Sequence, residues 1–427
     1  MKRDTIYRKY YFRLIVISAG VALLSCLLAF TLKKLTEHFE HLVFSVVKQQ
    51  NILFYILLPT IGITTIYFLR KYFFQNRKNK GITEIYKTLD HRKDHLPFFK
   101  IPSHYLNGFL TVIFGGSTGI EVSTVVATAA IGNSMYKRDF SVKMYKRELV
   151  CASVCAGVAI LFASPLAGVL FAVEVIARKL TKTLLMSCAA AAAVAWVLLH
   201  FLKPEPLIPM AAQGWQWIAI PFMLVLSFFS GLLSIYFTVL VIRIKSFFSG
   251  INNNFIRVNL GALVVGLMIC IFPFLYGDSY HALGEVALRP SLYSLGFLLL
   301  LVFLKPLASS LTLGAGGDGG VFAPSIVAGA FLGLAFAGLC NRYFGTSLVY
   351  LNFMLIGAAA ALSAAIYAPF TALFLVCNLA PNGFALFFPI LLCSLASNYA
   401  AQWLFPYNVY TFNLPTTHLP ATPLSGK

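Results

Sequence analysis

One acidic side chain of this sequence lies within a stretch that is otherwise apolar enough to enter a membrane. Glu121 is the only charged residue between Lys100 and Lys137, and it stands in the motif Gly119-Ile120-Glu121-Val122-Ser123. A carboxylate at membrane depth is costly, and such residues by default mark the path of an ion or a substrate. A matching stretch, Gly320-Val321-Phe322-Ala323-Pro324, follows 201 residues later.

Both stretches combine a glycine-rich backbone with the start of an apolar helix, and they read GIEVSTVVATAAIG and GVFAPSIVAGAFLG. The start of a helix presents free N–H groups and the positive end of the helix dipole, which together favour an anion. Two such starts, one in each half of the chain, can face a single anion. We therefore expect the chain to conduct an anion.

The composition is that of an integral membrane protein. Of the 427 residues 59% are hydrophobic and only 11% are charged, whereas about a quarter of the residues of soluble domains are charged. The formal net charge is +19, but the basic residues gather at the ends of apolar segments, which indicates membrane topology and not a nucleic-acid partner. The eight cysteines lie in apolar stretches without paired ligand spacing, so no metal site is expected from them.

The basic residues also predict the topology. Residues 1–13 carry Lys2, Arg3, Arg8, Lys9 and Arg13. The apolar run Leu14 to Leu32 that follows is too long for a signal-peptide core, so we expect a retained helix. By the excess of Lys and Arg on the cytoplasmic side, we predict a multi-pass protein of the cell (inner) membrane with both termini cytoplasmic. The segments 200–216 and 277–289 are then external loops.

A polar patch, Glu37-His38-Phe39-Glu40-His41, follows the first apolar run. Carboxylates and imidazoles bind metals, but the sequence shows no third ligand cluster. We interpret the patch as a solvated helix end outside the membrane.

Several apolar segments, among them 111–131 with its glycine interruption and 163–176, are too short or too broken to span about 30 Å. Broken helices at membrane depth are tolerated where they line a cavity or are covered by protein. A second internal match pairs ASPLAG at 163–168 with YAPFTA at 367–372, at an offset of 204. The sequence therefore predicts an all-α polytopic membrane protein built as an inverted repeat, with halves at about 50–200 and 215–412. Small-residue runs at 187–195 and 357–365 permit close helix contact, within one chain or between subunits.

The order of these motifs resembles the CLC family of chloride channels and chloride/proton antiporters. GGVFAP at 319–324 is close to the family's GGIFAP, and SPLAGVLFAVE at 164–174 resembles APLAGILFxxE. GIEVS at 119–123 stands where the family has G(K/R)EGP, but it lacks the basic residue, the second glycine and the proline. NKGITE at 79–84 is a weaker echo of GSGIPE. The resemblance implies a basic N-terminus at 1–13, a CLC-like transmembrane domain at 14–412, and a short tail at 413–427 without the C-terminal CBS domains of some members.

The resemblance also implies roles for single residues. Glu121 would be the gating glutamate, and the backbone N–H groups of Ile120, Glu121, Val321 and Phe322 would bind the anion. Tyr410, eight residues after Gln402, would donate its hydroxyl at the inner gate. The structural alternatives are a helix N-cap for Glu121, core packing for Phe322 and an interfacial tyrosine for Tyr410.

Two departures from the family bear on the mechanism. Val175 occupies the position of the antiporters' proton-relay glutamate, and valine carries no proton. Glu174 beside it is a helix-end residue, with replacement of the relay as its alternative role. Lys80 takes the place of the family's ion-binding serine, where it either attracts anions or snorkels to the membrane surface.

We therefore predict passive or weakly coupled transport of chloride or similar small anions. The alternative is a proton-coupled anion antiporter with a non-standard relay. An enzyme would need a nucleophile with a partnered base, or a metal cluster, inside the membrane, and the sequence contains neither. We expect no cofactor and no partners beyond small anions, membrane lipid and a second copy of the chain in a homodimer.

Overall fold

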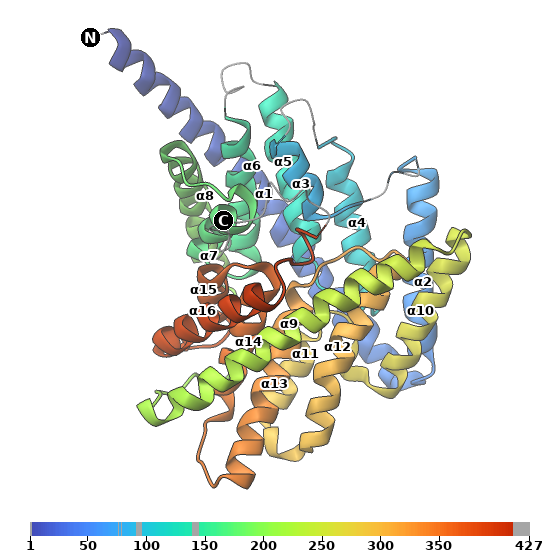
Figure 1. Cartoon of the computed structure of the whole chain (residues 1–427). Helices are drawn as coiled ribbons and strands as arrows, with labels where there is room; N and C mark the ends of the chain where they lie inside the picture. The colour runs from blue at the N-terminus through green and yellow to red at the C-terminus, as the bar shows by residue number, and fades with distance from the viewer. Residues whose placement is uncertain (1, 76, 78, 91–95, 139–144, 413–427) are drawn as a thin grey trace, which may run out of the picture.

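The computed structural model describes residues 2–75, 77, 79–90, 96–138 and 145–412, and over these residues the chain is helical without a β-strand. The predicted tail at 413–427 lies outside the described residues. The α-helices, shown in Figure 1, are α1 Lys2–Gln50, α2 Phe54–Tyr72, α3 Ile82–Asp90, α4 Lys100–Ile113, α5 Glu121–Arg138, α6 Lys146–Leu161, α7 Pro165–Phe171, α8 Lys182–Leu202, α9 Ile220–Ser249, α10 Asn254–Ile271, α11 Tyr280–Leu288, α12 Leu295–Ala315, α13 Phe322–Tyr343, α14 Tyr350–Ile366, α15 Pro369–Cys377 and α16 Phe387–Leu404. A π-helix, Ala172–Ala177, continues α7, and four short 3₁₀ turns complete the described elements.

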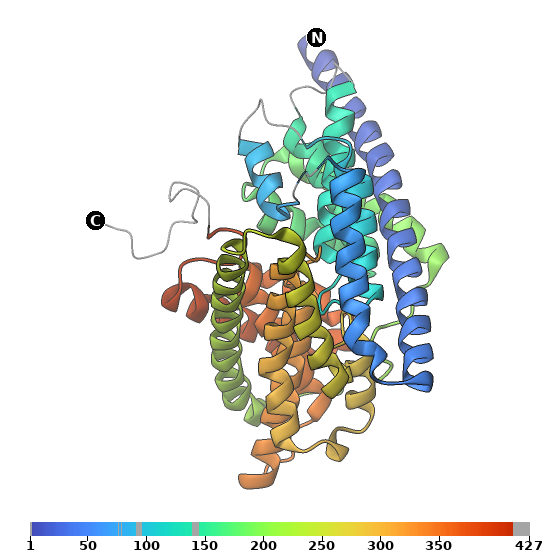
Figure 2. The ribbon, with the colours of Figure 1, turned by 90° about the vertical axis from the view of Figure 1, so that its right-hand side faces the viewer.

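Seven of the described helical segments are long and apolar enough to cross a membrane. They are Arg8–Val47, Lys182–Leu202, Trp217–Ser249, Asn254–Ile271, Leu295–Ala315, Phe322–Tyr343 and Gly383–Leu404. Figures 1 and 2 show the blue-to-green elements gathered at one end of the molecule and the yellow-to-red ones at the other. α1 and α2 depart from this arrangement: α1 runs from the first end into the second (Figure 2), and α2 lies beside α10.

The first helix is longer than predicted. α1 continues from the apolar run to Gln50 because neither glycine nor proline interrupts residues 33–50. The patch at 37–41 therefore lies inside a helix, and our interpretation of it as a solvated helix end is wrong. Glu40 is only 8% exposed.

The predicted break in the first glycine stretch is confirmed. α4 ends at Ile113, and α5 begins at Glu121 after a seven-residue loop. Gly115 in this loop has a φ of +81°, and Gly316, 201 positions later, has a φ of +111°. Glycine adopts this left-handed backbone without steric cost, so both loops turn at the same point of the repeat.

The second internal match also has the same backbone in both copies. Ala163 and Tyr367 have φ values of 52° and 56°. The next residues, Ser164 and Ala368, are extended with φ of −136° and −138°, and each is followed by a proline that starts a helix. Proline disfavours a helical conformation in the residue before it and suits the first helical position. The two helices, α7 and α15, contact each other, as an inverted repeat requires, while the boundaries of its halves remain a prediction.

One expectation needs correction, and one alternative is decided. The segment 277–289, predicted as a loop, contains α11, whose residues Ala282, Leu283, Val286 and Ala287 are buried. The run at 357–365 lies in α14, where every residue from Leu351 to Ile366 is buried. A Cβ on Gly357 would overlap the carbonyl oxygen of Gly329 in α13, so this run makes its close helix contact within one chain, the first of the two roles predicted for it.

The crossing of the two glycine loops gives a test of the fold. A Cβ on Gly320 would overlap the side chain of Val122. We expect Gly320→Ala to destabilise the protein by about 1–3 kcal/mol, seen as a lower midpoint of thermal unfolding in detergent. Gly296→Ala is the control, because a Cβ there meets nothing within 4 Å. Equal midpoints for the two variants would contradict close packing of the loops.

Candidate functional site

The two glycine loops bind each other in a reciprocal pattern. Gly119 and Gly320 form an antiparallel bridge. The N–H of Ser117 donates to the hydroxyl of Thr312 at 3.1 Å, and the N–H of Asp318 donates to the hydroxyl of Thr111 at 2.9 Å. Each loop is thus held by a threonine from the helix that precedes the other loop. This arrangement brings the starts of α5 and α13 together.

Glu121 is the first residue of α5 and is 4% exposed. Its carboxylate bends back over Gly119, where a Cβ would overlap it. Oε1 accepts a hydrogen bond from the hydroxyl of Tyr280 at 3.1 Å, while Oε2 has no hydrogen-bond partner among the described residues. The carboxylate therefore occupies a helix start with one oxygen unsatisfied, a position that an anion would also favour.

Two cavities meet at this point of the chain. The first, which we call the Glu121 cavity, has a volume of about 770 Å³ and is lined by Ile120 and Glu121 together with parts of α1 and α11. The second, the Tyr410 cavity, has a volume of about 280 Å³ and is lined by Val122, Tyr410 and residues 316–321. Consecutive residues of one helix start thus face different cavities, with Glu121 at the boundary.

The predicted anion-binding residues lie around this boundary. Phe322 is 1% exposed, and its ring packs against those of Phe171 and Tyr410, with centroids 5.5 and 6.3 Å away. The hydroxyl of Tyr410 has no hydrogen-bond partner among the described residues. Ile120 and Val321 are buried on either side of the loop bridge. The structure therefore brings Ile120, Glu121, Val321, Phe322 and Tyr410 together, and their roles toward an anion remain predictions.

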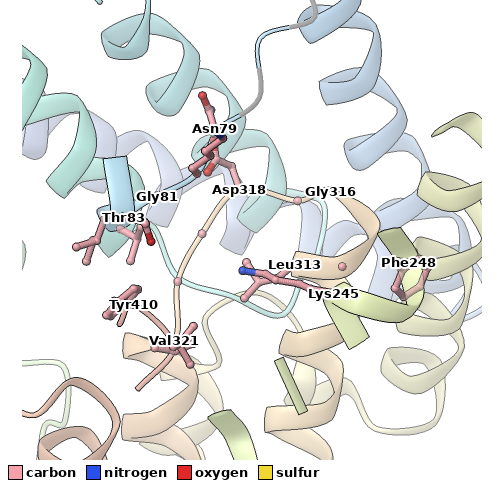
Figure 3. A pocket seen from close by; sticks show the side chains of 18 of the residues that line it. Asn79, Gly81, Thr83, Lys245, Phe248, Leu313, Gly316, Asp318, Val321 and Tyr410 are labelled. Carbon is pink, nitrogen blue, oxygen red and sulfur yellow. The ribbon is translucent and has the colours of Figure 1, made fainter. Parts of the chain in front are cut away.

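Basic side chains surround the Tyr410 cavity, as Figure 3 shows for Lys245, whose nitrogen points toward the loop at 316–321. Lys80 lines this cavity and is exposed, and its backbone N–H donates to Glu84. Arg70 and Arg257 are the other basic residues of the described lining. A group of cations at a cavity mouth raises the local concentration of anions.

Glu174 and Val175 lie elsewhere, and neither lines one of these two cavities in the described part of the chain. The carboxylate of Glu174 accepts hydrogen bonds from the backbone N–H of Phe370 at 3.3 Å and from Thr371, at 2.7 Å from its N–H and 2.6 Å from its hydroxyl. It caps the start of α15, which lacks a side-chain cap from its own N-cap residue. Val175 is buried in the π-helix.

The sequence analysis did not identify two residues of the site, Lys305 and Tyr280. Lys305 is 0% exposed, and its amine donates to Ser117 at 2.9 Å and to Gly277 and Ser279 at 2.8 Å. It thereby ties the Glu121 loop to the turn that carries Tyr280. Lys305 is the only charged residue between Arg289 and Asp318, so the argument applied to Glu121 would have found it. Tyr280 is uncharged, and nothing in its sequence neighbourhood predicted a contact with Glu121.

Known proteins resemble this chain over most of its length. A family model described as voltage gated chloride channel matches residues 61–402. The voltage-gated ClC-type chloride channel ClcB of Salmonella typhi is 26% identical over 64% of this chain and 66% of its own length. The H(+)/Cl(-) exchange transporter ClcA of Vibrio cholerae serotype O1 is 26% identical over 81% of this chain and 75% of its own.

Solved structures share the fold. A CLC-type fluoride/proton antiporter superposes with a TM-score of 0.79 at 23% identity, covering 93% of this chain and 97% of the other. A slow cyanobacterial Cl−/H+ antiporter gives 0.80 at 21% identity, covering 93% and 96%. The agreement confirms the predicted inverted repeat of broken helices.

Tyr280 offers a test of the site. Tyr280→Phe removes the donor to Glu121, and a hydrogen bond to a charged group contributes about 1.5–3 kcal/mol. We expect the carboxylate to leave the helix start more readily, so that anion efflux from liposomes rises about tenfold or more at constant pH. Tyr293→Phe is a matched control. The hydroxyl of Tyr293 also donates to a glutamate, Glu285, at 3.1 Å, but this hydrogen bond does not involve the glycine loops. Unchanged efflux in Tyr280→Phe would show that this hydrogen bond does not hold the gate.

Proposed function

The chain belongs to the voltage gated chloride channel family, and on that premise we propose that it exchanges chloride or a similar small anion for protons, with Glu121 as the gate. From the sequence we predicted passive or weakly coupled transport, with a proton-coupled antiporter as the alternative. The names of the relatives favour the alternative, because the relative with the wider coverage is named an H(+)/Cl(-) exchange transporter. Both similar structures described above are those of antiporters.

The position of Glu121 between the two cavities is the observation that carries this proposal. Its carboxylate lies over Gly119 at the start of α5, where a helix presents its free N–H donors, while Val122, the next residue, faces the Tyr410 cavity. A protonated or displaced carboxylate leaves these donors to an anion. One side chain thus alternates between carrying a proton and yielding its place to an anion, which is the condition for exchange.

On the side of the Tyr410 cavity, protons reach Glu121 without a carboxylate at position 175 to carry them. Val175 carries no proton, and Glu174 is engaged at the start of α15. Asp318, the only carboxylate in the described lining of the Tyr410 cavity, is held by Asn79 at 2.6 Å and His104 at 3.2 Å. Protons therefore reach Glu121 from this side through water, and we expect weak coupling with a variable number of protons per anion.

We also propose the orientation and assembly. The Tyr410 cavity, with its basic lining, faces the cytoplasm and the Glu121 cavity faces outward, in line with the bias of Lys and Arg toward the cytoplasm. Both termini are then cytoplasmic, and residues 14–412 form the transmembrane domain in the cell (inner) membrane. The chain works as a homodimer with one pore per subunit.

Proton movement under a chloride gradient tests the exchange. In liposomes with the voltage controlled, we expect wild-type protein to drive slow uphill proton uptake. Glu121→Gln and Glu121→Ala remove the titrating group, so both should lose proton uptake and keep an anion flux that no longer depends on pH. Glu174→Gln is the matched control and should keep proton uptake. Chloride flux without proton uptake in the wild type would favour passive conduction instead.

Lys80 should matter if it faces the permeating anion. Removing one unit charge from a water-filled cavity costs about 1 kcal/mol at a distance of about 4 Å, so Lys80→Ser should raise the half-saturating chloride concentration about fivefold. Lys87→Ser is the control, because Lys87 is exposed on α3 outside the described lining of the Tyr410 cavity. Equal values for the two variants would indicate that Lys80 lies only at the membrane surface.

A further inference from the structure

Three ligand-bearing side chains from distant parts of the chain meet in the wall of the Glu121 cavity. They are Glu40 of α1, Asp278 of the turn before α11 and His281 of α11. One ligand atom from each residue lies within 4.8 Å of the other two. The fold thus adds two further ligands, Asp278 and His281, to a glutamate of the polar patch of α1, and the sequence alone did not reveal this grouping.

Glu40 supplies an independent indication of a ligand. Its Oε1 is buried without a hydrogen-bond partner among the described residues. A Cβ on Gly277 would overlap this oxygen, so the glycine lets the carboxylate approach the backbone of the turn. A buried polar oxygen without a partner is unfavourable, and a cation bound between Glu40 and Asp278 would satisfy it.

The donor set selects the kind of cation. Two carboxylates and one imidazole are ligands that Zn²⁺ and similar transition metals accept. Ca²⁺ takes six to eight oxygen ligands and Mg²⁺ keeps an octahedral shell of oxygens, so both are poorer matches to a site that contains a histidine. Three protein ligands also leave a coordination position open toward the cavity.

Lys305 lies close enough to interact electrostatically with both Glu40 and Asp278, and its amine donates to the carbonyl of Gly277. A lysine beside the carboxylates opposes the binding of a cation whenever its amine is protonated. Binding should therefore be reversible, as a regulatory site requires, and weaker than in a structural zinc site.

The turn connects the three ligands to the gate. Asp278 and His281 flank Tyr280, whose hydroxyl donates to Glu121 at 3.1 Å. A metal ion that joins Asp278 and His281 to α1 would hold Tyr280 against the carboxylate and keep Glu121 at the helix start. We propose that Glu40, Asp278 and His281 form a binding site for a divalent transition-metal cation such as Zn²⁺, which slows anion transport by fixing the gate. The effect on transport rests on the proposed function of Glu121, whereas the binding itself does not.

Binding and transport are measured separately on the purified full-length protein. Titration calorimetry should show Zn²⁺ binding to the wild type, and Co²⁺ should give a visible absorption spectrum that Zn²⁺ abolishes. His281→Ala and Glu40→Gln should each weaken Zn²⁺ binding at least about tenfold, since even residues behind the ligands cost that much. His281 is exposed, so its variant should fold even if Glu40→Gln does not. His200→Ala, an exposed histidine of α8 outside the described lining, should bind Zn²⁺ as the wild type does.

In liposomes, Zn²⁺ added on the side of the Glu121 cavity should slow chloride efflux by wild-type protein and by His200→Ala, but not by His281→Ala. No Zn²⁺ binding by the wild type, or unchanged binding by His281→Ala, would overturn the site. If Zn²⁺ binding depends on His281 but leaves chloride efflux unaltered, the proposal that the metal ion fixes Glu121 at the helix start is wrong. Because calorimetry does not depend on transport, the site is tested even if proton exchange is absent.

Discussion

The pairing of two backbone breaks inside the membrane is the constraint on which the rest of this structure depends. Loops at membrane depth expose N–H and C=O groups that lipid cannot satisfy. Here the loops bind each other through the bridge between Gly119 and Gly320, and a backbone N–H group of each loop donates to the hydroxyl of Thr111 or Thr312. Close approach requires glycine, and the repeat supplies it at matched positions. The starts of α5 and α13 meet because the loops that precede them must meet.

Once the helix starts face each other, the proposed site for an anion would be made largely of backbone. Val321 and Phe322 are apolar and buried, as this proposal requires: the donors would be N–H groups, while the side chains exclude water and pack the core. The carboxylate of Glu121 is the exception, and it needs support in a medium of low dielectric constant. Tyr280 donates to it, and Lys305 holds together the loop and the turn that carry the two residues.

The same fold accommodates channels and exchangers, and the relatives of this chain carry both names. In this chain the carboxylate of Glu174 is bound to the start of α15, and the cavity on the Tyr410 side is lined by basic residues. Such a lining attracts anions and disfavours excess protons in the same space, which is consistent with loose coupling.

The sequence by itself determined the features that depend on residue type and short spacing. The positions of glycine and proline predicted the helix breaks and the repeat. Hydropathy predicted the membrane helices, and Glu121, isolated in apolar sequence, indicated where the candidate site lies. The tertiary structure alone decided which distant groups become partners. Glu40 was predicted at a solvated helix end, but it is buried against the turn at Gly277. Nothing in the sequence singled out Tyr280, whose hydroxyl reaches Glu121 only in the folded chain. Backbone conformation is largely set by neighbours in the chain, whereas the burial of a charge depends on segments hundreds of residues away.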